Sequence, residues 1–190
     1  MARIAFMTFG VLQEPWGAER VRGFEDRLDA TFAAAEASPG FFAMDDSESD
    51  PALAGEEQAQ GPWGVYRRTS LYPYEGEDPT LDRDATTLSI WKDLDSVFAF
   101  AYSGRHLEAL QRRADWFEPR RWPTYVAWWV GDDEIPTWAE ACARLERLHA
   151  DGPGPSAFDF HHPFDATGQP VVRRARPLVG HDGEVRTSGQ

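Results

Sequence analysis

One histidine, His106, has a sequence spacing that would place an imidazole beside an apolar pocket. Phe98, Tyr102 and Leu110 lie at intervals of four residues around it, so one helix would carry all of them on one face. An imidazole has a pKa of about 6.5, and a histidine in a pocket could therefore remove a proton from an activated carbon or a phenol at neutral pH. The alternative is a histidine that is hydrogen-bonded in the core or at the helix rim.

Aromatic residues are candidates for the walls of such a pocket. Trp91 ends the strand TTLSIW, and Tyr102 precedes His106 by one helical turn, so we expect both at the pocket. In YVAWWV, Trp128 and Trp129 are adjacent and would point to opposite faces of a strand. One of them could stack on a substrate. Both cannot pack into the same helix-covered core, so one of them must be covered by something else. A second sheet from a symmetry mate would supply that cover, although core and interface packing would explain both indoles equally.

A second group of polar residues lies in and after AFDF, where a further strand is expected. Asp159 could orient His161, whereas His162 would share a face with Phe158 and Phe160. A rim position with ordinary hydrogen bonds is the alternative. The sequence has no histidine pair at helical spacing and no cysteine cluster, so we expect no zinc or iron site. A haem needs only one histidine ligand, and that option stays open.

Other chemical motifs are missing from the sequence. The glycines after the first expected strand do not form a dinucleotide-binding turn, and no phosphate-binding loop follows a strand. Ser103 lacks the glycines of a hydrolase nucleophile elbow. The arginines of the segment 112–121 could form a gate for anions, or a solvated surface that balances the acidic excess; they are Arg112, Arg113, Arg120 and Arg121.

Composition limits the partners. The net charge of −13 disfavours binding to nucleic acid and to anionic membranes. Cys142 is the one cysteine, so no intramolecular disulfide and no thiolate zinc site can form. No apolar run approaches the roughly 20 residues that span a bilayer. We therefore expect a cytoplasmic protein, and the 42% of hydrophobic residues in 190 are enough for one core.

The expected elements alternate between strands and helices. Strands are predicted at 2–9, 41–44, TTLSIW and YVAWWV, and less firmly at 63–74. Helices are predicted at 19–37, from KDLDS through VFAFAYSGRHLEAL, and in PTWAEACARLERLHA. Both faces of the first strand carry apolar residues, which indicates a sheet covered at least partly on both faces. We expect one domain at 1–165, interrupted by an acidic, mobile insertion at 45–62, and a disordered or partner-draped tail at 166–190.

These segments carry a family resemblance. GFFAMDD, SIWKDLDSVFAFAYSGRHLEALQRRADWFEP, VAWWV and IPTWAEACARLERLHADGPGPSAFDF together resemble an uncharacterised bacterial family in the dimeric α/β-barrel superfamily, which includes the antibiotic-biosynthesis monooxygenases. The resemblance implies an α+β, ferredoxin-like protomer whose antiparallel sheet has helices on one face and pairs with a second copy to close a barrel. It also implies a pocket between the sheet and the helices of each protomer. The acidic insertion and the arginine-bearing tail depart from this pattern.

The functional hypothesis combines the residues with this resemblance. We expect an enzyme that acts on an apolar, aromatic or polyketide-like small molecule, by oxygenation without a cofactor or by proton transfer such as cyclisation. His106 would be the base or orienting donor, Trp91 and Tyr102 the pocket walls, and Trp128 or Trp129 the stacking surface. The alternatives are a haem-binding member of the same superfamily and a non-catalytic protein that holds a hydrophobic ligand.

Overall fold

The computed structural model describes residues 1–45, 61–74 and 82–172. Most of the expected acidic insertion, residues 46–60, and of the expected tail, from residue 173, lie outside the described residues. The start of the tail is described, and a single bridge joins Pro170 to Phe164. None of the helices in the described ranges is long and apolar enough to cross a membrane.

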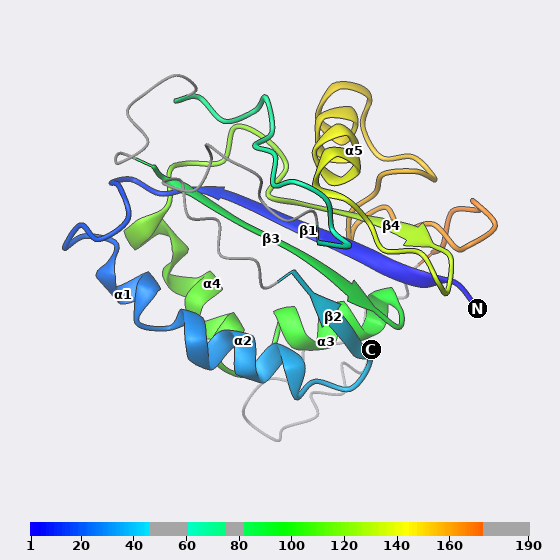
Figure 1. Ribbon diagram of the computed structural model, residues 1–190, viewed down its shortest axis with the longest axis horizontal. Helices are drawn as coiled ribbons and strands as arrows, with labels where there is room; N and C mark the ends of the chain where they lie inside the picture. Colours follow the sequence, from blue (N-terminus) through cyan, green and yellow to red (C-terminus); the bar gives the residue numbers. More distant parts are fainter. Residues whose placement is uncertain (46–60, 75–81, 173–190) are drawn as a thin grey trace, which may run out of the picture.

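A four-stranded antiparallel sheet forms the centre of the protein (Figure 1). Its strands are β1 (Arg3–Val11), β2 (Phe41–Met44), β3 (Asp84–Trp91) and β4 (Tyr125–Val130), in the order β2-β3-β1-β4. Helices connect β1 to β2 and β3 to β4, so that strands distant in sequence become neighbours. This is the ferredoxin-like strand order, and it confirms the expected α+β class with an antiparallel sheet.

Helices cover both faces of the sheet, whereas the sequence led us to expect them on one. α1 (Arg22–Glu25), α2 (Leu28–Glu36), α3 (Leu94–Ala101) and α4 (Gly104–Trp116) lie on one side, and α5 (Trp138–Asp151) lies on the other (Figure 1). The alternation of β1 explains this arrangement. Ile4 and Phe6 belong to the core under the first helices, and Ala5 and Met7 belong to the core under α5.

The two helices expected before β2 and β4 are each broken into two. Ahead of β4, Asp93 caps α3 by accepting a hydrogen bond from the backbone of Ser96 (2.8 Å), and α3 ends at Ala101 with Tyr102 as its C-cap. Ser103 is extended and Gly104 has a φ of +47°, a left-handed value that glycine adopts without strain. Tyr102 and His106 are therefore not on one continuous helix, and the simple helical spacing that linked them does not hold.

Two expected strand segments are irregular. Residues 61–74 form turns and loops that pack on the α5 side of the sheet, where Trp63 and Tyr72 are buried in the core. The segment AFDF makes a single bridge, in which Phe158 exchanges two backbone hydrogen bonds with Ala127 of β4. Aromatic and β-branched residues favour strands. These two segments nevertheless have no partner strand along their length, and they bury aromatic side chains such as Trp63, Tyr72 and Phe158 in the core.

The protein itself covers both tryptophans of β4. Trp128 is fully buried beneath α5, where the guanidinium of Arg144 lies 5.2 Å from its ring. Trp129 packs on the opposite face and donates a hydrogen bond to the carbonyl of Phe164 (2.7 Å). One chain thus covers Trp128 fully and Trp129 in part. Homodimerisation stays a prediction.

Candidate functional site

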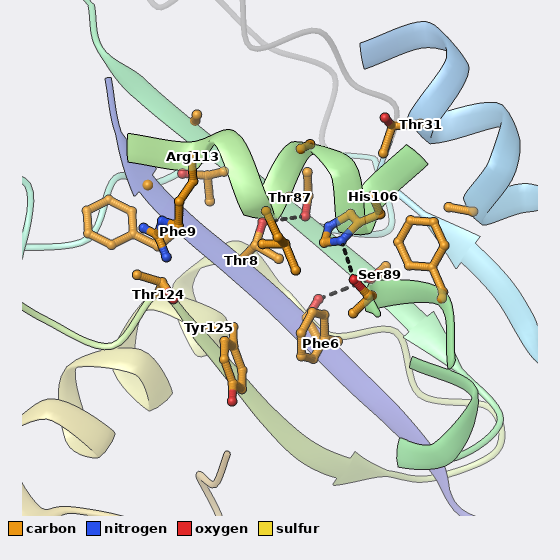
Figure 2. Close-up of a pocket in the computed structure, with 18 of the residues that line it drawn as sticks. Phe6, Thr8, Phe9, Thr31, Thr87, Ser89, His106, Arg113, Thr124 and Tyr125 are labelled. Atoms are coloured by element: carbon orange, nitrogen blue, oxygen red, sulfur yellow. Dashed lines mark hydrogen bonds between the residues drawn. The ribbon is translucent and has the colours of Figure 1, made fainter. Parts of the chain in front are cut away.

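A large cavity of about 980 Å³ lies between the sheet and the helices α1 to α4 (Figure 2). Its volume is in the upper part of the range of small-molecule sites in proteins. Phe6 of β1, Phe32 of α2, Trp91 of β3 and Phe100 of α3 contribute apolar walls. The cavity therefore suits a ligand with a large apolar or aromatic body.

The floor of the cavity is a stretch of sheet with a polar row next to an apolar one. Thr87, Thr8 and Tyr125 lie opposite one another on β3, β1 and β4, and all three line the cavity. The hydroxyl oxygens of Thr8 and Thr87 are 2.7 Å apart. One hydroxyl donates to the other, so the hydrogen of the second remains available to a ligand oxygen. In the next row Phe6 lies between Ser89 and Ala127.

His106 reaches this cavity from the first turns of α4 (Figure 2). Its Nδ1 is 2.8 Å from the carbonyl oxygen of Ala101, and because a carbonyl only accepts, Nδ1 carries the proton. No group among the described residues bonds to Nε2. The ring packs against Phe100 at 4.9 Å, and burial lowers the pKa of the imidazole below its usual value. A neutral imidazole with a free Nε2 lone pair is the form that can accept a proton.

Trp91 and Tyr102, the two expected wall residues, both line the cavity. The indole of Trp91 is buried, stacks on Phe100 at 5.3 Å and donates a hydrogen bond to the hydroxyl of Ser89 (2.9 Å). Tyr102 is 43% exposed and packs against Phe98 at 4.5 Å. Trp91 is thus a fixed inner wall, and Tyr102 belongs to the rim.

Trp128 and Trp129, the expected stacking surface, are not among the residues that line the cavity. Trp128 points to the α5 side because alternate residues of a strand face opposite sides of the sheet. Trp129 shares the face of the cavity, but it lies at the end of the sheet opposite Ile4, and the carbonyl of Phe164 holds its indole. The structure places both in packing positions, which corrects the expectation for this pair.

Three arginines also line the cavity: Arg27 at the start of α2, and Arg113 and Arg120, two of the four arginines that could form an anion gate. Arg113 lies on α4 two turns beyond His106, and Arg120 follows the end of that helix. The ring of Phe117 lies 6.0 Å from the Arg113 guanidinium. Burial and, to a smaller extent, the positive charge of Arg120 lower the pKa of Arg113, which stays protonated at neutral pH.

Acidic residues line a different part of the cavity and have their own cationic partner. Arg68 forms ion pairs with Asp82 (2.7 Å) and Asp84 (3.4 Å), and Tyr66 donates a hydrogen bond to Asp84. Burial raises the pKa of Asp84 and of Tyr66. Thr86 also donates to Asp84, so that its carboxylate is well supplied with donors. This group has the character of a satisfied structural network.

The histidine doublet differs from its expected arrangement. Asp159 accepts hydrogen bonds from the backbone of His161 and of His162 (both 2.8 Å), and its carboxylate is 3.1 Å from Nδ1 of His162. The partner of Asp159 is thus His162, because the segment turns at this point and does not continue as a strand. His161 lines the rim of the cavity. No cluster of three potential metal-binding side chains occurs in the part of the chain that is described.

Comparisons with known proteins define the family. The model of the family described as "Domain of unknown function (DUF3291)" matches residues 3–174, and the chain belongs to that family. No curated protein matches the chain significantly. Among solved structures, SnoaB, a cofactor-independent oxygenase from Streptomyces nogalater, is similar with a TM-score of 0.38 and 10% identity over 71% of this chain and 97% of that chain. A likeness this distant supports no conclusion about function. The argument about function rests on the cavity instead.

Proposed function

We propose that this protein is an enzyme that removes a proton from an apolar, aromatic or polyketide-like small molecule, with His106 as the base. The observation that carries the proposal is the state of this imidazole. Ala101 fixes the proton on Nδ1, burial keeps the ring neutral, and Nε2 has no partner among the described residues at the wall of a 980 Å³ cavity.

The residues around His106 suit the charge that such a step creates. When Nε2 takes a proton from carbon or from a phenol, the imidazolium keeps its hydrogen bond from Nδ1 to the Ala101 carbonyl, which favours the charged ring. The negative charge moves onto a substrate oxygen, and the Thr8–Thr87 hydroxyl pair offers one hydrogen to such an oxygen. The aromatic walls hold the substrate body and exclude water.

Two reactions could follow proton removal without a cofactor. In a cyclisation, the carbanion attacks a carbonyl carbon of the same molecule, and the imidazolium returns the proton to the new alkoxide. In an oxygenation, the carbanion of a methylene gives one electron to dioxygen and the two radicals combine to a peroxide anion. The imidazolium returns its proton to this anion, and the hydroperoxide loses water to leave a ketone. The methylene is then oxidised by four electrons and dioxygen is reduced to one carbonyl oxygen and one water.

Replacement of His106 by glutamine tests the proposal. Glutamine keeps polarity but does not titrate near neutrality, so the His106→Gln variant should lose about 100- to 10,000-fold in kcat on any substrate found by screening aromatic and polyketide-like compounds. His149→Gln is the matched control, because His149 lies near the end of α5 and does not line the cavity. Near-normal turnover by a folded His106→Gln variant would overturn the assignment of the base.

Haem binding is a second candidate function, and the same imidazole favours it. An axial histidine commonly donates from one ring nitrogen to a carbonyl and binds iron through the other, which is the arrangement of His106 and Ala101. His106 would hold the iron, the aromatic walls would contact the macrocycle, and the bound group would supply redox chemistry. An absorption spectrum of the purified protein, followed by titration with haemin, tests this: a Soret band shift in the wild type that is lost in His106→Gln would favour haem.

A non-catalytic role remains the third alternative from the sequence. The cavity alone would serve a protein that stores or carries a hydrophobic ligand. Saturable binding of the screened compounds with the same affinity in wild type and His106→Gln, and no turnover in either, would favour this role over the enzyme.

A further inference from the structure

The positive end of the cavity carries a feature that the proposed function does not use. Arg113 and Arg120 line the cavity, and neither forms an ion pair within the described residues. The protein contains 32 aspartate and glutamate residues and only 19 lysine and arginine residues, so acidic partners are abundant. Other arginines, Arg27 of the same cavity among them, also have no ion pair within the described residues, so this lack alone does not distinguish Arg113 and Arg120. What distinguishes the pair is that two cations lie near each other at the wall of the cavity.

Two other arginines, one near the cavity and one on α4, have carboxylate partners. Arg68 pairs with Asp82 and Asp84 at the acidic part of the same cavity, and on the outer side of α4 Arg112 pairs with Asp115 at 3.0 Å. Arg113 is adjacent to Arg112 in sequence but turns to the cavity, where its guanidinium is near the charge of Arg120 and 6.0 Å from the ring of Phe117. A half-buried guanidinium therefore lies near a second, exposed cation, and neither has a carboxylate partner among the described residues, so binding of an anion by both would be favourable.

Resting on the proposed function, we propose that Arg113 and Arg120 bind a carboxylate of the ligand, so that the substrate class is an aromatic acid whose body lies along α4. Figure 2 shows Arg113 toward the Thr124 end of the cavity and His106 at a separate position on the wall. His106 and Arg113 are seven residues apart on α4, and at a rise of about 1.5 Å per residue this separates them by about 10 Å along the axis. Guanidinium groups bind carboxylates with two parallel hydrogen bonds, which gives both affinity and orientation.

This arrangement would orient the substrate for His106. An acid anchored at the arginine pair extends its apolar rings over the sheet between Thr8 and Phe6, and it presents a position about 10 Å from the carboxylate to Nε2. The anchored group takes no part in the chemistry and contributes only orientation and binding energy. A neutral compound with the same rings would bind less tightly and in more than one orientation.

A matched pair of probes tests the inference without any turnover. Anthracene-2-carboxylate and anthracene-2-carboxamide have the same rings and differ in charge, and their intrinsic fluorescence reports binding directly. We expect the wild type to prefer the carboxylate by about 10- to 100-fold, because a charge-assisted pair is replaced by weaker neutral contacts. Arg113→Gln and Arg120→Gln should weaken binding of the carboxylate by a similar factor and leave binding of the carboxamide unchanged.

Controls separate this inference from its alternatives. Arg112→Gln changes the same charge on the outer side of α4 and should keep the preference for the carboxylate. Arg120 is exposed, so Arg120→Gln should fold even if Arg113→Gln does not. Equal affinity of the wild type for both probes, no binding of either, or loss of the preference in Arg112→Gln to the same extent would overturn the inference.

The source of the carboxylate is decided by a second pair of ligands. Haemin carries propionates and its dimethyl ester does not, so arginine-dependent preference for haemin over the ester, with no preference between the anthracenes, would overturn the aromatic-acid assignment and indicate that the arginines bind a haem propionate. Preference for the anthracene acid assigns the carboxylate to a substrate. Because the anthracene measurements report binding and not proton removal by His106, the arginine pair can be upheld even where the His106→Gln variant retains turnover and the proposed base fails.

Discussion

Substitution of two buried tryptophans by phenylalanine should have different effects on stability, although the chemical change is the same. Trp91 and Trp128 are both at most 2% exposed, and they lie on opposite faces of the sheet. The Nε1 hydrogen of Trp91 is donated to Ser89, whereas Nε1 of Trp128 is buried without a partner among the described residues. Each substitution removes similar apolar surface, so this loss nearly cancels in the difference.

The hydrogen bonds determine what remains of the difference. Trp91→Phe loses a bond whose net contribution is about 1 kcal/mol, and Trp128→Phe removes an unsatisfied donor whose burial costs about 1 to 3 kcal/mol. The contact of Arg144 with Trp128 is weakened, which offsets about 0.5 to 1 kcal/mol of that gain. We therefore expect Trp91→Phe to lower the free energy of unfolding by about 2 kcal/mol more than Trp128→Phe does.

Urea unfolding followed by fluorescence and circular dichroism measures this difference. Ser89→Ala is the control, because it leaves the ring of Trp91 in place and removes its acceptor. The control should lower the free energy of unfolding by about 1 to 3 kcal/mol, as expected for a buried donor left without a partner. Equal losses in the two phenylalanine variants, or a larger loss in Trp128→Phe, would refute the reasoning.

Two further predictions concern the assembly and the titration of the protein. Light scattering at micromolar concentration should give a mass of about twice the 21.4 kDa of the chain, and a clean monomer would end the prediction of a homodimer. Because burial lowers the pKa of His106 in the folded state, stability from the neutral ring is present at neutral pH and is lost as the pH falls through the folded-state pKa. In a nuclear magnetic resonance titration the His106 signal, assigned with His106→Gln, should have a midpoint below the usual value of about 6.5, and a higher midpoint would contradict burial as the dominant influence on this imidazole.

Much of the fold could be predicted because it depends on local patterns. The strand alternation of YVAWWV gave the bounds of β4, the run FFAM gave β2, and the apolar periodicity after Pro136 gave α5. Apolar residues on both faces of β1 also indicated correctly that both faces of the sheet are covered. The same patterns could not show that α5 is the second cover, because the side of a sheet on which a terminal helix packs is a long-range property.

The candidate site divides in the same way. The sequence by itself selected His106 and Trp91, because a polar residue near an apolar stripe and an aromatic residue at a strand end are local signals. Only the tertiary structure decided that Ala101 fixes the tautomer of His106, that Trp128 and Trp129 are packing residues, and that Arg113 faces the cavity with no ion-pair partner in the described part of the chain. Charge pairing and burial depend on tertiary contacts between elements distant in the sequence. Local spacing in the sequence carries no information about those contacts.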